Sequence, residues 1–231
     1  MLAASIFLYA MGGHLQFRIT RGDLSRVLDR TETTDHFVLH YAHGAKNRAD
    51  VALTAEDLEF RYHQLHETLG VEPKLPITVW EFPSAEVKKA LVGAGGTLYA
   101  KPWTREIFVE TSRFPAGVLR HEMAQVFAGT FGERFFGMSL AWRWRGPLPL
   151  PALSGGLIEG VAEAASSSDP DEDATIHEQA RAMIEAGLAP PLSAVMGAGF
   201  STQAGRRAYT MAGSFASFLL APRGAERLRA L

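Results

Sequence analysis

The chain has 231 residues and contains no cysteine. Without thiols there is no disulfide bond and no thiolate ligand, so any metal ion must be held by nitrogen and oxygen donors. An excess of basic residues is also missing, because 23 Lys and Arg are balanced by 25 Asp and Glu. The net charge is −2 and the sequence has no basic block to follow a phosphate backbone, which makes nucleic acid a poor candidate partner.

A long hydrophobic run is absent too, although the N-terminus is apolar. Residues 2–11 carry no charge, but a transmembrane helix needs about 20 apolar residues, and a signal peptide needs positive charge before its apolar core. We interpret residues 1–20 as the end of a transmembrane segment, as a membrane anchor or as a packed helix. The first two alternatives imply a membrane-associated or extracytoplasmic location. The chain stops within a predicted helix, which suggests a fragment of a longer protein.

The hydrophobic fraction of 47% is sufficient for an ordinary folded core. Residues 36–112 contain β-rich segments, whereas residues 113–220 show helical periodicity. We therefore predict an α+β fold, in which a small mixed β-sheet lobe with an edge strand precedes a mostly helical lobe. The predicted strands span residues 36–41, 77–82, 95–100 and 105–110, and the predicted helices span residues 54–69, 85–91, 115–130, 155–166, 173–186 and 203–220.

Two local signals refine this prediction. The segment Thr54-Ala55-Glu56-Asp57 resembles a capping box and predicts that the first helix begins there. Residues 135–151 are apolar, basic and rich in proline, which predicts a loop insertion. Its residues Trp142 to Arg145 either cover the neighbouring helices or form a cleft wall, a lipid contact or a partner contact.

The most informative segment is His121-Glu122-Met123-Ala124-Gln125. His-Glu also occurs at His66 and His177, but there the surrounding residues predict solvated helix faces. Around His121 an apolar stripe covers one side of the predicted helix, and His121, Glu122 and Gln125 share another sector. In the motif His-Glu-x-x-His, two histidines one helical turn apart hold zinc and the glutamate acts as a general base. This chain keeps that spacing, with glutamine as the last residue.

A second predicted helix carries Glu159 and Glu163 among small and apolar residues. Carboxylates in such surroundings need a partner, which a metal ion or a histidine would supply. Together the two helices resemble those of the gluzincin metallopeptidases, the thermolysin-like and M1-aminopeptidase-like group of the peptidase MA clan. The resemblance implies a Zn²⁺ ion held by His121, Gln125 and Glu159, with Glu122 as the general base and Glu163 orienting His121.

The resemblance covers roughly residues 36–220. It implies that a peptide or protein substrate binds along an edge strand, and that Tyr209 on the last helix stabilises the oxyanion. The residues that correspond to this edge strand are Thr97, Leu98, Tyr99 and Ala100.

Gln125 departs from the family pattern, because a neutral amide is a poorer zinc ligand than imidazole. Three outcomes are open: Gln125 coordinates weakly, a distant histidine such as His14, His36, His40 or His43 replaces it, or the metal site is lost. The predicted function is hydrolysis of peptide bonds by a zinc-dependent peptidase. The alternative is a metal-free, inactive peptidase-like module that binds a peptide or protein.

Overall fold

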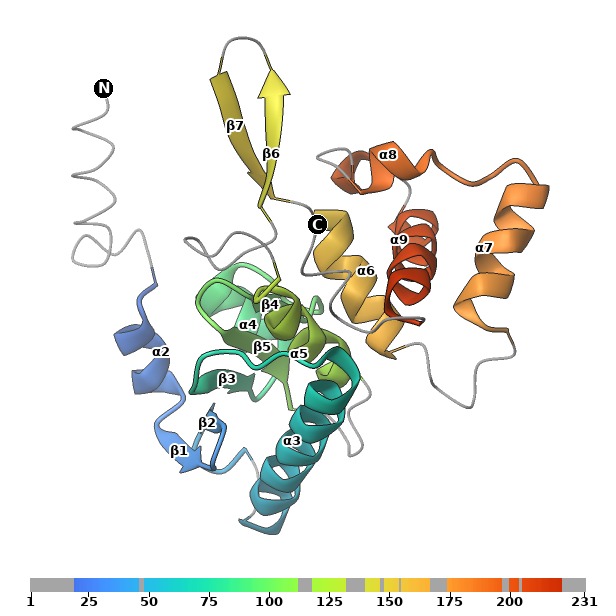
Figure 1. Cartoon of the computed structure of the whole chain (residues 1–231). Helices are drawn as coiled ribbons and strands as arrows, with labels where there is room; N and C mark the ends of the chain where they lie inside the picture. Colours follow the sequence, from blue (N-terminus) through green and yellow to red (C-terminus); the bar gives the residue numbers. More distant parts are fainter. Residues whose placement is uncertain are drawn as a thin grey trace.

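The computed structural model describes residues 19–45, 48–111, 118–131, 140–145, 148–153, 155–166, 174–196, 200–203 and 205–221. These residues form a mixed α/β structure with a five-stranded sheet, a separate two-stranded hairpin and eight α-helices (Figure 1). The sheet and its covering helices come first in the chain, and a group of helices follows. The predicted α+β class, with a mixed sheet, is therefore confirmed at this level.

The sheet has the strand order β1-β2-β3-β5-β4. Its three central strands are parallel, whereas the outer strands β1 and β4 pair antiparallel with their neighbours. Helix α3 links the parallel strands β2 and β3, and α4 leads from β3 toward β4 and β5. The bounds are β1 (Arg30–Thr33), β2 (Phe37–Tyr41), α3 (Arg48–Leu69), β3 (Ile77–Phe82), α4 (Ala85–Val92), β4 (Tyr99–Lys101) and β5 (Glu106–Glu110).

Helices cover both faces of this sheet, and strand β3 shows why. Its residues Ile77 and Val79 belong to a hydrophobic cluster with α3 and with the helices that follow the sheet. Trp80 and Phe82 belong to a second cluster with α4 and with α2 (Arg21–Val27). Because side chains alternate along a strand, a central strand that is apolar on both sides requires a helix on each face.

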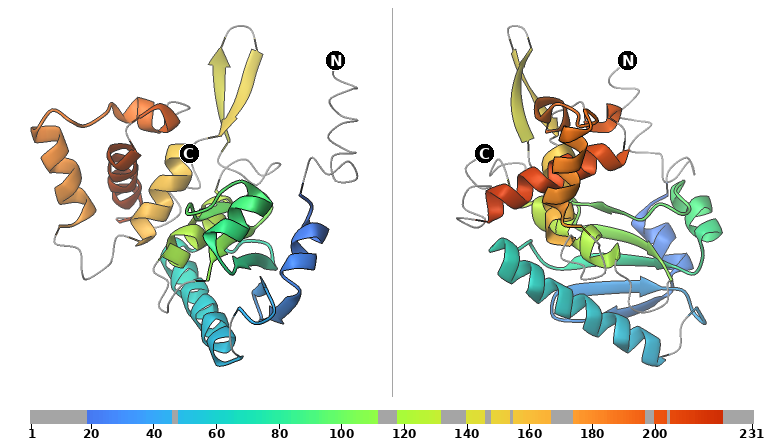
Figure 2. Two further views of the ribbon diagram at one scale, coloured as in Figure 1. Left: turned by 180° about the vertical axis from the view of Figure 1, so that it is seen from behind. Right: turned by 90° about the vertical axis from the view of Figure 1, so that its right-hand side faces the viewer.

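The second part of the chain is helical. It contains α5 (Val118–Ala128), α6 (Gly155–Ser166), α7 (Ile176–Glu185), α8 (Leu192–Val195), a short 3₁₀ turn (Phe200–Thr202) and α9 (Gly205–Leu220). Helix α6 packs against both α5 and α9, and the views in Figures 1 and 2 show it between them. A glycine permits the close approach of α6 and α9, because a Cβ atom at Gly160 would lie 2.6 Å from the carbonyl oxygen of Ala212.

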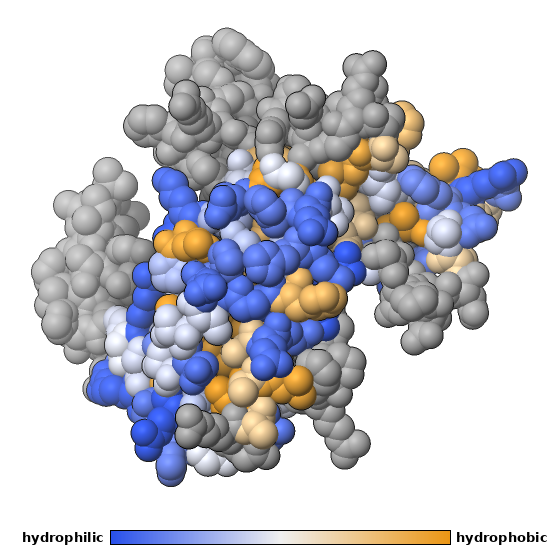
Figure 3. Space-filling view, turned by 60° about the horizontal axis from the view of Figure 1, so that its bottom comes forward, coloured by the Kyte–Doolittle hydropathy of each residue, from blue (hydrophilic) through white to orange (hydrophobic). Residues whose placement is uncertain are grey.

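On one face of the molecule the described residues are mainly polar. Figure 3 shows the face that comes forward when the bottom of Figure 1 is turned toward the viewer, with hydrophilic residues covering most of it. The hydrophobic residues on this face lie in small, separate patches. Scattered apolar residues of this kind are ordinary on the surface of a folded protein.

Three local predictions are wrong. The strand at residues 37–41 is not the first, because the polar strand β1 precedes it and pairs with it. Thr54 does not cap a helix, because α3 already begins at Arg48 and the Thr54 hydroxyl donates to the carbonyl oxygen of Asp50 within the helix. The predicted loop insertion contains the antiparallel hairpin β6 (Leu140–Arg145) and β7 (Leu148–Leu153), which projects from the rest of the structure (Figures 1 and 2).

Other boundaries are confirmed. Helix α3 ends before Gly70, which has a positive φ of 60°, and Ser84 caps α4 as predicted. Pro115, the predicted first turn of a helix, and residues 1–18 of the predicted membrane segment lie outside the described residues. Within the described ranges, no helix has the length and hydrophobicity needed to cross a membrane.

The close contact of α6 with α9 predicts that Gly160→Ala destabilises the protein. The added methyl group would overlap the Ala212 carbonyl, and overpacking of this kind costs about 1–3 kcal/mol. Gly205→Ala is the matched control, because nothing lies within 4 Å of a Cβ atom at Gly205 in the first turn of α9. Urea unfolding of both variants checks the prediction, which fails if the two variants are equally stable.

Candidate metal and catalytic site

Helix α5 places His121, Glu122 and Gln125 at the boundary between the sheet and the helical part. Its opposite side is apolar, and Met123, Val126 and Phe127 are fully buried in the main core. Burial of that side fixes the rotation of α5 about its axis. Since residues four apart in a helix lie on the same face, His121 and Gln125 project together toward α6.

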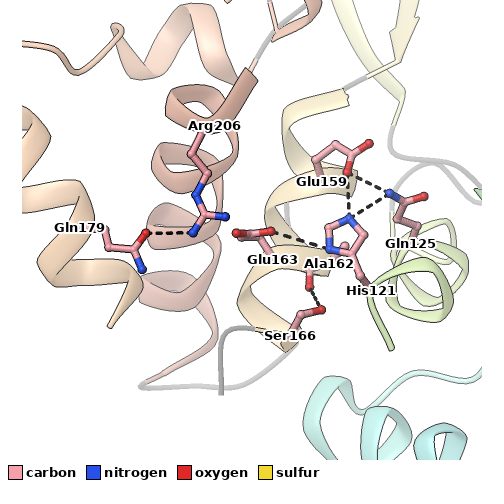
Figure 4. A network of polar contacts seen from close by, with 8 residues as sticks. All are labelled: His121, Gln125, Glu159, Ala162, Glu163, Ser166, Gln179 and Arg206. Carbon is pink, nitrogen blue, oxygen red and sulfur yellow. Dashed lines mark hydrogen bonds and ion pairs between the residues drawn. The ribbon is translucent and has the colours of Figure 1, made fainter. Parts of the chain in front are cut away.

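Helix α6 supplies the acid that meets them. Glu159 Oε2 lies 3.3 Å from His121 Nε2 and accepts a hydrogen bond of 2.9 Å from Gln125 Nε2. The Gln125 Nε2 atom also lies 3.2 Å from His121 Nε2, which closes a triangle (Figure 4). The structure thus brings together the three residues predicted as metal ligands, although Glu159 is 38 positions from His121 in the chain.

Glu163, one turn further along α6, contacts the other side of the same imidazole. Its Oε2 atom lies 3.7 Å from His121 Nδ1 (Figure 4). Burial alone would lower the pKa of His121, but the hydrogen bond with Glu159 and the charges of Glu122, Glu159 and Glu163 raise it above 6.5. At this distance Glu163 attracts the Nδ1 side of the ring by charge, and carboxylates on this side of the imidazole are also found around metal-bound histidines.

The size of the triangle fits a metal ion. A tetrahedral zinc site with ligand distances of about 2.0–2.1 Å has ligand atoms about 3.3 Å apart. The three separations measured here are 2.9, 3.2 and 3.3 Å. His121 Nε2 and Glu159 Oε2 are suitable donors as they stand, and a half-turn of the Gln125 amide would present its oxygen in place of its nitrogen.

Glu122 lies beside this triangle in a different environment. Its side chain is buried, and within the described part of the chain its Oε2 atom has no hydrogen-bond partner. Burial raises the pKa of Glu122 to about 7, and the charge of His121 only partly opposes the effect of burial. A carboxyl group that titrates near neutral pH can take up and release a proton under ordinary conditions, as a general base must.

The edge strand β4 lies directly against this carboxylate. Ala100 forms a backbone hydrogen bond with Glu122, and α5 packs on β4. The ordered strand begins at Tyr99, so Thr97 and Leu98 of the predicted edge segment precede it. The position of β4 at the edge of the sheet, as predicted, is confirmed.

Sequence reasoning missed Lys88, which lies behind the edge strand. Its side chain is fully buried, and Nζ donates to the carbonyl oxygen of Thr97 at 2.5 Å and lies 3.7 Å from Glu110. Burial lowers the pKa of Lys88, and the charges of Glu110 and Glu122 oppose this effect. A lysine near the middle of a short helix is normally exposed, so nothing in the sequence distinguished it from a surface residue.

Tyr209 on α9 lies close to the site. Its ring centre lies 6.4 Å from that of His121. Burial, together with the charges of Glu159, Glu122 and Glu163, raises the pKa of Tyr209 to about 12. The phenol is therefore protonated at neutral pH and is able to donate a hydrogen bond.

The distant histidines named as substitutes have other partners. His36 pairs with Glu59, His40 stacks on Trp80, and His43 accepts a hydrogen bond from Arg30. His14 lies outside the described residues. Among the histidines with a described position, these contacts give no support to a replacement for Gln125.

No protein-family model matches this chain, and no curated protein is significantly similar to it. A function must therefore be argued from the side chains of the site.

The raised pKa of Glu122 predicts a pH effect on stability in metal-free protein. Between pH 4.5 and about 7 the folded state binds a proton that the unfolded state has released, so stability falls as pH rises through this window. Across this window the free energy of unfolding falls by roughly 3 kcal/mol because of Glu122. Glu122→Gln removes this pH dependence. The stability of the variant relative to that of the parent should therefore be greater at pH 8 than at pH 5. Urea unfolding in the presence of a chelator measures this difference, and a difference independent of pH would contradict the assignment.

Proposed function

We propose that this chain is a zinc-dependent peptidase of the gluzincin type, in which His121, Glu159 and Gln125 hold the metal. The observation that carries the proposal is the triangle of donor atoms, formed by two separate helices, with a buried carboxyl group of raised pKa beside it. An imidazole, a carboxylate and an amide oxygen are all ligands that zinc accepts, and the chain has no thiol to compete with them.

The division of roles follows from the surroundings of each group. When bound, zinc would polarise the scissile carbonyl and lower the pKa of a water molecule. Glu122 Oε2, which is buried and has no hydrogen-bond partner among the described residues, would accept the proton and later pass it to the leaving amine. Tyr209, held neutral, would donate to the developing oxyanion, and Glu163 would keep the His121 ring in place.

The position of strand β4 supports the proposal that the substrate is a peptide. It forms one edge of the five-stranded sheet, and an extended peptide can add to such an edge through main-chain hydrogen bonds. The hydrogen bond between Ala100 and Glu122 means that a peptide lying along β4 would pass next to the proposed base. Both endopeptidase and exopeptidase action fit this arrangement.

One observation favours a second candidate, a metal-free module that binds a peptide without cutting it. The Gln125 amide donates to Glu159 and contacts His121, so the polar groups of the triangle have partners without an ion. Such a module would use the same β4 edge. Zinc content separates the two candidates, because the module would neither carry zinc after purification nor take it up when zinc is added.

The peptidase proposal predicts that Glu122→Gln abolishes hydrolysis while zinc stays bound. Loss of a general base typically costs about 10²–10⁴-fold in rate, and glutamine keeps the shape of the side chain. The matched control is Glu67→Gln, which changes the exposed glutamate of another His-Glu pair on α3. A quenched-peptide assay gives kcat/KM, and metal analysis gives zinc content. Equal activity in Glu122→Gln and the parent would refute the role of this residue.

A further prediction concerns Gln125→His. An imidazole is a better zinc ligand than an amide, so zinc affinity should rise by about 10-fold or more. Competition with a chelator of known affinity measures the change. Peptide hydrolysis that appears only in Gln125→His would support the binding-module candidate for the parent. If zinc affinity does not change, Gln125 does not face the metal.

A further inference from the structure

A second group of nitrogen and oxygen donors lies on α3 and at the start of β2. It consists of His36, Glu59 and His63, which we name the α3 cluster. One ligand atom from each of these side chains lies within 4.8 Å of the other two. Glu59 and His63 are four residues apart on α3 and share a face of the helix, and His36 directly precedes β2.

Two members of the α3 cluster are already held in place. Glu59 Oε1 accepts a hydrogen bond of 3.0 Å from the backbone N–H of His36, and Oε2 lies 2.6 Å from His36 Nδ1. The His36 ring stacks on Tyr62, with ring centres 3.8 Å apart. Tyr62 is itself buried and packs against Phe127, so the His36 imidazole rests on the rigid core. Preorganised donors lower the entropic cost of binding an ion.

The third member is free to complete a site. The His63 side chain is exposed, and its ring meets that of His36 edge-on at 5.4 Å. Exposed side chains change rotamer on the picosecond to nanosecond timescale, so His63 can close toward an ion at small cost. The partial exposure of His36 and Glu59 leaves a path for the ion and room for water as a further ligand.

We propose that the α3 cluster binds a divalent transition metal of the zinc class, independently of the site on α5 and α6. Two imidazoles and one carboxylate, with water in the fourth position, are a common donor set for zinc and do not suit Mg²⁺ or Ca²⁺, which prefer oxygen ligands alone. The ion links the start of β2 to the middle of α3. Because it binds the folded state, it stabilises the protein by an amount set by its concentration relative to Kd.

Titration of the metal-free full chain with ZnCl₂ in a calorimeter tests this proposal. His121→Ala, which removes a ligand of the other site, should retain one zinc site with a rise in Tm on zinc addition. Adding His63→Ala to that variant should weaken the remaining site by at least about 10-fold and abolish the rise in Tm. His177→Ala, which changes an exposed histidine on α7, is the matched control and should keep full binding.

The outcomes distinguish this proposal from the proposed peptidase. If His121→Ala binds no zinc, or if His63→Ala leaves its binding unchanged, the α3 cluster is not a metal site. If His121→Ala keeps its site while the parent shows no additional one, the α3 cluster stands and the peptidase proposal fails. Far-ultraviolet circular dichroism of each variant confirms that the fold is intact, and Glu59→Gln provides a second variant that preserves side-chain shape.

Discussion

The packing of α6 against α5 is the constraint on which the candidate site depends. His121 and Gln125 lie on one helix and Glu159 on the other, and their donor atoms meet only because the two helices pack closely. On the other side of α6, two glycines allow close packing against α9. Gly160 lets α9 approach α6, and Gly213 leaves space beside Glu163, since a Cβ atom there would lie 2.7 Å from Glu163 Cγ. Small shifts in such packing displace functional groups by ångströms, and catalytic geometry tolerates little displacement.

The electrostatics of the site favour a cation. Three carboxyl groups, those of Glu122, Glu159 and Glu163, act on the single imidazole of His121 in partly buried surroundings. Grouped negative charges of this kind are unfavourable unless a positive charge balances them. A proton on His121 supplies part of that balance, which accounts for its raised pKa. A divalent ion would supply more charge at the same place, so metal and proton would compete for the site.

The sheet joins the edge strand β4 to the buried carboxyl group of Glu122. Strand β3 is buried on both faces and anchors β5, which in turn pairs with β4. Lys88 stabilises this edge of the sheet, because its buried ammonium group donates a hydrogen bond to the carbonyl oxygen of Thr97, just before β4 begins. The Lys88 charge also lowers the pKa of Glu122, although burial of the carboxyl group dominates. The edge strand and Glu122 are therefore coupled through shared neighbours.

The sequence by itself determined the strongly periodic elements and the local half of the site. Strand β3, helix α4 with its Ser84 cap and the one-turn spacing of His121 and Gln125 all follow from residue order, because hydrophobic alternation, capping and helical repeat are local properties. Strand β1 was missed because its four residues are polar and exposed and derive their conformation from pairing with β2. Only the tertiary structure decided that Glu159 meets His121, that Lys88 is buried and that Glu122 titrates near neutral pH. Each of these depends on which surfaces pack together, and a local pattern of residues does not specify the contacts or the desolvation that such packing creates.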